Sequence, residues 1–170
     1  RVLGNGLRPD IWMEFKNRFG IARVHEFYGA SEGNTGFVNI FNFDKTVGWS
    51  PQYGSAWDVV QYDVDEDEPV RGDDAFMKRM PVDETGLLIT RITEQNPFDG
   101  YTDAQSSEKK ILRDVFEKGD ARFNTGDLVV LQKHGHIQFG DRIGDTFRWQ
   151  GENVATTEVE SVIMKWPEIE

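Results

Sequence analysis

The chain has 170 residues, of which 38% are apolar and 12% aromatic, so it can form a packed core and differs from disordered proteins. Its formal net charge of −11 argues against nucleic acid as a broad partner, although backbone N–H groups can still form a local anion site. The absence of cysteine excludes disulfides, thiolate nucleophiles and cysteine-based zinc sites.

A helix followed by a strand is predicted near the start. The stretch "PDIWMEFKNRFG" (residues 9–20) begins with Pro9, which suits a first helical turn, and ends with Gly20, which suits a left-handed stop. Its apolar residues fall on one helical face: Ile11, Trp12, Phe15 and Phe19. The run "ARVHEFY" (residues 22–28) then alternates like a strand and leads into the turn "GASEGNTG". This order predicts an α/β arrangement, in which ligands bind at the ends of strands.

Residues 47–137 read as a β-rich subdomain. Four runs rich in β-branched and aromatic residues are separated by Gly, Asp and Pro: "SAWDVVQYDV", "TGLLITRI", "DLVVLQK" and "GHIQFGD". One helix is predicted between them, "SEKKILRDVFEKG", capped by Ser106 or Ser107 and closed by Gly119. Its inward-facing residues would be Ile111, Leu112, Val115 and Phe116.

The last segment predicts a hairpin around Gly151 and then an amphipathic helix capped by Thr156 or Thr157. Its apolar stripe is Val159, Val162, Ile163 and Trp166, and too little chain surrounds it to cover that stripe. We therefore expect this helix to open a second domain. Because the chain starts at Arg1 and ends without a capping signal, we expect it to be an internal piece of a longer protein. It contains no run of about 18 apolar residues, so we expect no transmembrane segment.

Ser31 and Glu32 are the first candidates for chemistry. A carboxylate beside a glycine turn suits Mg²⁺, which binds one or two carboxylates together with phosphate oxygens, and the hydroxyl can donate to a phosphate. The alternative is a solvated Ser-Glu pair that opens a turn.

Asp127, in "FNTGDLV", and Arg142, in "GDRIGDTF", are the next candidates. Asp127 can accept hydrogen bonds from two neighbouring ribose hydroxyls, or it can accept from its own backbone in an Asx-turn. Arg142 can clamp a ligand or simply form a surface ion pair. These motifs taken singly leave both interpretations open.

Their order resembles the adenylate-forming superfamily of acyl-CoA synthetases, luciferases and peptide-synthetase adenylation domains. The motifs "EFYGASEGN", "FNTGDL" and "DRIGDTFRWQGENVATTEVE" are most similar to the fatty acid transport protein branch, the very-long-chain acyl-CoA synthetases. The likeness spans nearly the whole chain, including "PFDGYTD" and "EKKILRDVF".

The resemblance implies an ATP or AMP site. The loop Gly4, Asn5, Gly6 would lie on one face of the adenine and Tyr28, followed by Gly29, on the other. Glu26 would accept from the adenine amino group. Asp127 and Arg142 would take the ribose hydroxyls.

The resemblance also implies the reacting groups. Ser31 would contact the α-phosphate, and Glu32 would hold Mg²⁺. Gly151 would line the route of the coenzyme A thiol. Gly144 or Asp145 would act as the hinge about which a small C-terminal domain rotates between the two half-reactions.

The implied fold is α/β with a β-rich, distorted barrel-like subdomain, followed by the start of a small α+β domain. The expected divisions are residues 1–45, 46–141 and 142–170. The implied reaction is ATP- and Mg²⁺-dependent ligation of a long- or very-long-chain fatty acid to coenzyme A. The family's phosphate loop and its C-terminal lysine have no counterpart here, so we expect these residues alone to be inactive.

Two other functions stay open: ligation of another carboxylate such as a bile acid, and fatty acid binding or transport without catalysis. No nucleic acid partner is expected. We expect a cytoplasmic location or peripheral membrane association through other regions.

Overall fold

The computed structural model describes residues 1–29, 35–94, 97–98, 100, 103–144, 146–149, 152–164 and 166. Three short α-helices are present among them, α1 (Trp12–Arg18), α2 (Ala104–Lys109) and α3 (Thr156–Ile163), together with the 3-10 helix η1 (Lys133–Gly135). The strands of the first half are β1 (Val2–Gly4), β2 (Val24–Gly29), β3 (Gly36–Val38), β4 (Gly48–Trp49), β5 (Trp57–Val60), β6 (Tyr62–Asp63) and β7 (Glu68–Pro69). Those of the second half are β8 (Thr85–Arg91), β9 (Ile111–Arg113), β10 (Ala121–Gln132), β11 (His136–Arg142), β12 (Thr146–Trp149) and β13 (Glu152–Ala155).

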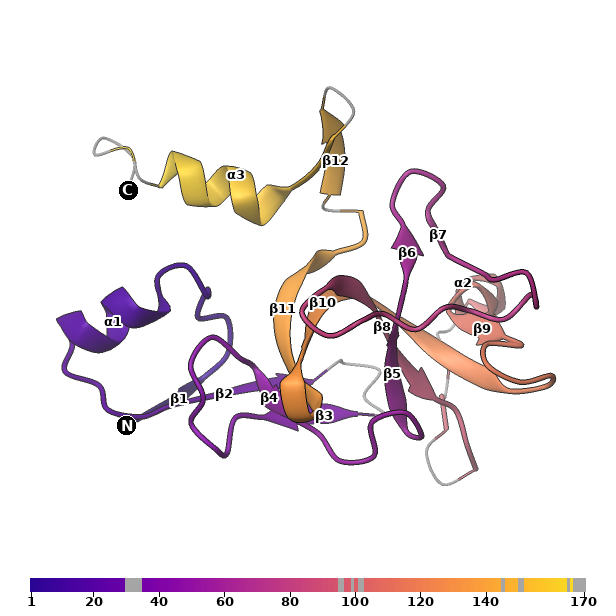
Figure 1. The fold of residues 1–170 in the computed structure, drawn as a ribbon, viewed down its shortest axis with the longest axis horizontal. Coiled ribbons are helices and arrows are strands. Elements are labelled where there is room, and N and C mark those ends of the chain that lie inside the picture. Colours follow the sequence, from indigo (N-terminus) through magenta and orange to yellow (C-terminus); the bar gives the residue numbers. More distant parts are fainter. Residues whose placement is uncertain are drawn as a thin grey trace.

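One mixed sheet organises the molecule (Figure 1). Its strand order is β1-β2-β3-β4-β11-β10-β8-β5, and β9 pairs with β10. Among the described strands of this sheet, β1 and β2 pair in parallel and the other pairs are antiparallel. The expected β-rich character is confirmed, but the sheet is open, because its end strands β1 and β5 do not pair in the described part of the chain. The sheet also runs through the expected division at residue 45, so the two parts share hydrogen bonds.

The core lies on both faces of the central strands. Along β8, Leu87 and Ile89 pack with Val60 on one side, while Leu88 packs with Val59 on the other. Because both faces are covered, β8 is buried over five consecutive residues rather than at alternate positions. A strand buried on both faces provides a rigid support for the residues at its neighbours' ends.

The first predicted helix is confirmed but shorter, and Gly20 has the expected left-handed backbone with φ 61°. Its stripe is only partly covered: Trp12 is buried, whereas Ile11 and Phe19 are exposed. The indole Nε1 of Trp12 donates to Asp44 Oδ1 at 3.0 Å, which ties the helix to the loop before β4.

The helix predicted over residues 107–119 is wrong. Helix α2 ends at Lys109, and Ile111–Arg113 form β9, which pairs with the start of β10. Asp120 then accepts from the N–H groups of Val115 and Phe116, so a turn replaces the last helical residues. Strand pairing with β10 outweighed the local helical pattern, because intrinsic propensities are small compared with tertiary contacts.

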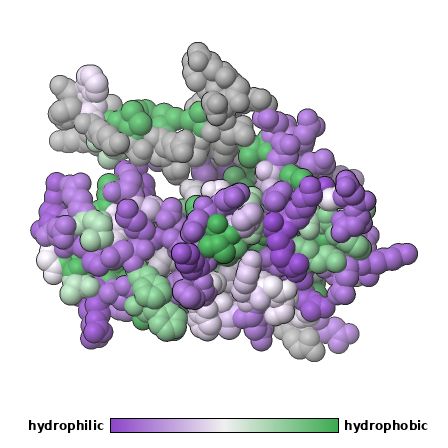
Figure 2. All heavy atoms as spheres, in the orientation of Figure 1, coloured by the Kyte–Doolittle hydropathy of each residue, from purple (hydrophilic) through white to green (hydrophobic). Residues whose placement is uncertain are grey.

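The last segment has the predicted form. Strands β12 and β13 pair as a hairpin that leads into α3, and Figure 1 shows both above the sheet, joined to it through the end of β11. The predicted stripe is exposed at Val162 and Ile163 of α3 and at Trp166, which lies beyond the end of the helix, and Figure 2 shows apolar atoms of α3 on the surface. None of the described helices is long and apolar enough to cross a bilayer.

Candidate functional site

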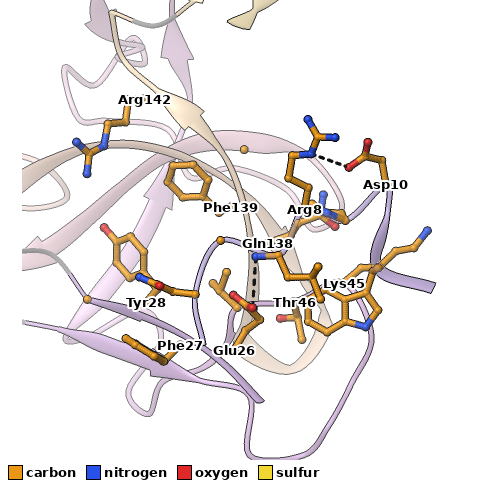
Figure 3. Close-up of a pocket in the computed structure, with 18 residues that line it drawn as sticks. Arg8, Asp10, Glu26, Phe27, Tyr28, Lys45, Thr46, Gln138, Phe139 and Arg142 are labelled. Atoms are coloured by element: carbon orange, nitrogen blue, oxygen red, sulfur yellow. Dashed lines mark hydrogen bonds and ion pairs between the residues drawn. The ribbon is translucent and has the colours of Figure 1, made fainter. Parts of the chain in front are cut away.

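A cavity of about 450 Å³ opens beside the parallel pair β1–β2 (Figure 3). It is lined by the loop after β1, by β2, by the loop before β4 and by β11. In Figure 3, Tyr28 and Arg142 lie at one end, Arg8 and Asp10 at the other, and Glu26 between them. Four segments that are far apart in the sequence therefore meet at one hollow.

Strand β2 presents Glu26 and Tyr28 to this cavity. Side chains at i and i+2 of a strand lie on one face, so Glu26 and Tyr28 point to the same side. Phe27 between them also lines the cavity and is exposed. Beyond Tyr28, Gly29 lines the cavity, and a Cβ added there would meet no atom within 4 Å. Strand β2 thus brings two polar side chains, Glu26 and Tyr28, to the cavity, together with the backbone of Gly29.

Glu26 is a buried carboxyl with one free acceptor. Only 3% of the residue is exposed. Its Oε1 accepts from the N–H of Leu7 at 3.3 Å, and within the described structure Oε2 has no hydrogen-bond partner. Burial raises the pKa of Glu26, and the nearby N–H groups of Leu7 and Gly6 oppose that shift. Such an acceptor is suited to a donor supplied by a ligand.

The loop after β1 forms the opposite wall. Asn5 and Gly6 line the cavity, whereas Gly4 is not among the lining residues. Gly6 has φ 89°, a left-handed backbone that favours glycine. A Cβ on Gly4 or Gly6 would meet nothing within 4 Å, so the backbone here is open on the side where a side chain would stand.

Asp127 joins Tyr28 to Arg142. The Tyr28 hydroxyl donates to Asp127 Oδ2 at 2.5 Å, and Arg142 Nε lies 3.2 Å from Asp127 Oδ1. Asp127 and Arg142 are also direct partners in the β10–β11 register. Asp127 is buried and lies behind these two residues rather than on the cavity wall. Tyr28, Asp127 and Arg142 therefore lie together, and Glu32, the fourth residue expected to meet them, lies outside the described residues.

A bulge in β10 aims Asp127 at this point. Pairing of β10 with β8 is interrupted between Asn124 and Leu128, and Gly126 has φ 78°. Asn124 Oδ1 accepts from the N–H of Gly126 at 2.9 Å, so Asn124, and not Asp127, forms the Asx-turn of this segment. Bulges often redirect a side chain beside a functional site, and this one leaves the Asp127 carboxylate free of its own backbone.

Burial raises the pKa of the Tyr28 phenol, and the negative charge of Asp127 and the hydrogen bond to it raise it further. The phenol therefore stays protonated and remains a donor across the physiological range. Its ring packs edge-on against Phe37, its cross-strand partner, which in turn packs on Trp57. The hydroxyl is consequently held by the core.

Several predicted residues lie outside the described structure: Ser31, Glu32, Asp145 and Gly151. Gly144 is described and has φ 97°, a backbone that suits a hinge glycine. Within the described ranges no group of three or more His, Asp or Glu side chains has the arrangement of a metal site. The predictions for Ser31, Glu32, Asp145 and Gly151 therefore stay predictions.

Sequence reasoning missed part of the wall. Thr46, Val47, Gln138 and Phe139 line the cavity, and Thr46 Oγ1 donates to the carbonyl of Ile137 at 2.8 Å. Gly48, whose added Cβ would lie 2.1 Å from the carbonyl carbon of Val38, lets this loop approach β3. A glycine between apolar residues in "TVGW" was the available signal.

No protein-family model matches the chain. It is 54% identical over 162 residues to the medium/long-chain-fatty-acid–CoA ligase FadD6 of Mycobacterium tuberculosis, which covers 95% of this chain and 27% of the relative. It is 48% identical over 166 residues to long-chain fatty acid transport protein 2 of Rattus norvegicus, with the same coverage.

Solved structures share the fold. ATP-bound MatB from Rhodopseudomonas palustris matches with a TM-score of 0.69 at 23% identity, over 99% of this chain and 30% of that one. The anthranilate CoA ligase AuaEII in complex with anthranoyl-AMP matches with a TM-score of 0.62 at 17% identity, over 98% of this chain and 29% of that one. The chain is therefore similar over 95% of its length to fatty acid transport proteins and long-chain fatty acid–CoA ligases, and it spans about 27% of the length of the curated relatives it matches.

Proposed function

We propose that the full-length protein is an ATP-dependent ligase that joins a long- or very-long-chain fatty acid to coenzyme A. The described residues would supply the base and ribose half of its nucleotide site. The observation that carries this proposal is the convergence of Tyr28, Asp127 and Arg142 beside a cavity that also holds the buried carboxyl of Glu26. The names of the relatives support the choice of a fatty acid and of coenzyme A.

The residues that line the cavity support adenosine as its ligand. The open backbone of the Asn5–Gly6 loop and the ring of Tyr28 would enclose the flat base, and Glu26 Oε2 would accept from its amino group. Asp127 and Arg142 would take the ribose hydroxyls. In this arrangement the phosphates would extend toward Ser31 and Glu32, which follow β2 in the sequence.

The reaction has two steps. A carboxylate oxygen of the fatty acid attacks the α-phosphorus of ATP, the bond to pyrophosphate breaks, and acyl-adenylate forms. The coenzyme A thiol then attacks the acyl carbon, loses its proton, and AMP leaves. Glu32 would hold Mg²⁺, which offsets the charge of the phosphates when bound, and Ser31 would donate to the α-phosphate. Gly151 would line the thiol route, and Gly144 or Asp145 would serve as the hinge.

The domain division at residues 1–45, 46–141 and 142–170 belongs to the same proposal. The exposed stripe of α3 supports it, because an apolar helix face of this kind is covered when more of the second domain is present. Peripheral membrane association at the cytoplasmic side would bring the enzyme to its fatty acid, and the relatives' name as transport proteins supports this.

The test is fatty-acid-dependent exchange of pyrophosphate into ATP by the full-length protein, followed by acyl-CoA formation. We expect Asp127→Ala to lower kcat/KM for ATP at least tenfold, because it removes a charged hydrogen-bond acceptor. Asp73→Ala, an exposed carboxylate far from the cavity, is the matched control. A panel of fatty acids, bile acids and small carboxylates assigns the substrate. A folded protein that binds fatty acid but shows no exchange with any carboxylate would refute the proposal in favour of a binding module.

A further inference from the structure

We propose that the Tyr28 hydroxyl is a positioning group that fixes the Asp127 carboxylate for the sugar, so that Tyr28 sets the preference of the enzyme for ribose over deoxyribose. This inference rests on the proposed nucleotide site and assigns a role to one hydroxyl within it. The hydroxyl of Tyr28 thus has a different role from its ring, which would contact the base.

The two bonds that hold Asp127 are unequal. The O–H···O⁻ distance to Tyr28 is 2.5 Å, at the short end for charge-assisted hydrogen bonds. The contact to Arg142 is longer, 3.2 Å, and the Arg142 side chain is 71% exposed. Exposed ion pairs contribute little because water screens them. Tyr28 therefore fixes the carboxylate, and Arg142 is the partner that can move.

The Tyr28 hydroxyl is itself fixed from behind. Its ring lies 5.9 Å from that of Phe37 between centroids, and the Phe37 ring lies 4.7 Å from that of Trp57. Phe37 and Trp57 are both fully buried. The rings of Tyr28, Phe37 and Trp57 thus connect Asp127 Oδ2 to the core. Arg142, in contrast, is the last residue of β11 and has an exposed side chain.

Asp127 retains acceptor capacity for a sugar. An ionised carboxylate offers about four lone-pair sites. Tyr28 and Arg142 engage one on each oxygen. The sites that remain would accept from two vicinal hydroxyls when Arg142, whose side chain is exposed, shifts. A carboxylate without the Tyr28 bond could rotate about its Cβ–Cγ bond and lose this alignment.

Base and sugar recognition then divide between two residues on one strand. Glu26 has the free acceptor oxygen and lies on the same face of β2 as Tyr28, and in the described structure neither of its oxygens is bonded to Asp127. Removing the Tyr28 hydroxyl should change the preference for ribose over deoxyribose and leave the preference for adenine unchanged. Changing Glu26 should alter the preference for adenine and leave the sugar preference unchanged.

The experiment measures kcat/KM in pyrophosphate exchange by the full-length protein with ATP, 2′-deoxy-ATP, 3′-deoxy-ATP and GTP. Tyr28→Phe keeps the ring and removes the hydroxyl. We expect its kcat/KM to fall about tenfold for ATP and much less for the deoxy nucleotides, with an unchanged ATP to GTP ratio. Glu26→Gln should lower the ATP to GTP ratio and leave the sugar preference unchanged.

Tyr62→Phe is the matched control, because Tyr62 donates to Asp67 Oδ1 at 2.6 Å in the β6–β7 hairpin, away from the cavity. In an Asp127→Asn background, Tyr28→Phe should cause no further loss of sugar preference. Thermal unfolding of each variant shows that it is folded.

A folded Tyr28→Phe enzyme that keeps the wild-type preference for ATP over the deoxy nucleotides would overturn this inference and leave the ligase intact. An equal loss with ATP and the deoxy nucleotides would also overturn it. A wild-type protein that binds no adenine nucleotide would instead refute the proposed function itself.

Discussion

Glu26→Gln should make the protein more stable and a poorer nucleotide binder. The wild-type carboxyl is 3% exposed and one of its oxygens has no partner in the described structure. A buried unpartnered polar atom costs about 1–3 kcal/mol, and more when it is charged. Gln keeps the shape and can still accept from the Leu7 N–H, so the variant removes the charge and replaces the free acceptor oxygen by an amide donor.

We expect the free energy of unfolding at about pH 8 to rise by about 1 kcal/mol in Glu26→Gln, which shifts Tm by about 2–4 °C in a chain of this size. The sign depends on pH. Burial raises the folded-state pKa of Glu26 above its ordinary value of 4.5. Wild-type stability is therefore greatest, relative to the variant, below about pH 4.5, and this advantage is lost as pH rises through the raised pKa.

The assay is urea or thermal unfolding of the purified protein at several pH values, together with calorimetric titration of AMP. Affinity for AMP should fall about tenfold, because the Gln amide would present a donor to the adenine amino group. Glu84→Gln, an exposed carboxylate, should change stability by less than about 0.5 kcal/mol. A variant less stable than wild type at about pH 8 would show that Glu26 serves the fold and would refute this reasoning.

Three further substitutions test the framework around the site. In urea unfolding, Gly48→Ala should lower the free energy of unfolding by about 3 kcal/mol or more, because the new Cβ would lie 2.1 Å from the β3 backbone. Gly54 also has a left-handed backbone, but a Cβ there would meet no atom within 4 Å, so Gly54→Ala should cost only about 1–2 kcal/mol. Arg79→Met should lose about 3 kcal/mol, because Arg79 Nε lies 2.7 Å from the fully buried Asp58, and adding Asp58→Asn should restore most of it; no recovery would contradict that pairing. Burial lowers the pKa of His136 below its ordinary 6.5. The neutral imidazole therefore contributes to the free energy of unfolding above that pH, and this contribution is lost as pH falls through the lowered pKa. His136→Phe should remove this loss of stability in acid. Unfolding midpoints with the same slope below about pH 6.5 in wild type and variant would contradict the role of His136.

The sequence by itself determined most of the local elements and the likeness to fatty acid transport proteins and long-chain fatty acid–CoA ligases. Strand β2 follows from its alternation, α1 from Pro9 and Gly20, and the β12–β13 hairpin with α3 from their periodicity. The order of three motifs indicated this likeness, because residue types and their separations can be read directly from the sequence. The same local rules failed at residues 107–119, where β10 was available as a partner and a strand replaced the predicted helix.

Only the tertiary structure decided how the site is joined. Tyr28 and Asp127 are 99 residues apart in sequence, and nothing local to either indicates a hydrogen bond between them. Asp127 reaches Tyr28 because a bulge in β10 turns it away from its own backbone, and Arg142 faces it because β10 and β11 pair in that register. Glu26 is left with a free oxygen because β1, β2 and their loop bury it. Such contacts depend on the packing of strands distant in sequence, and local sequence patterns carry little information about that packing.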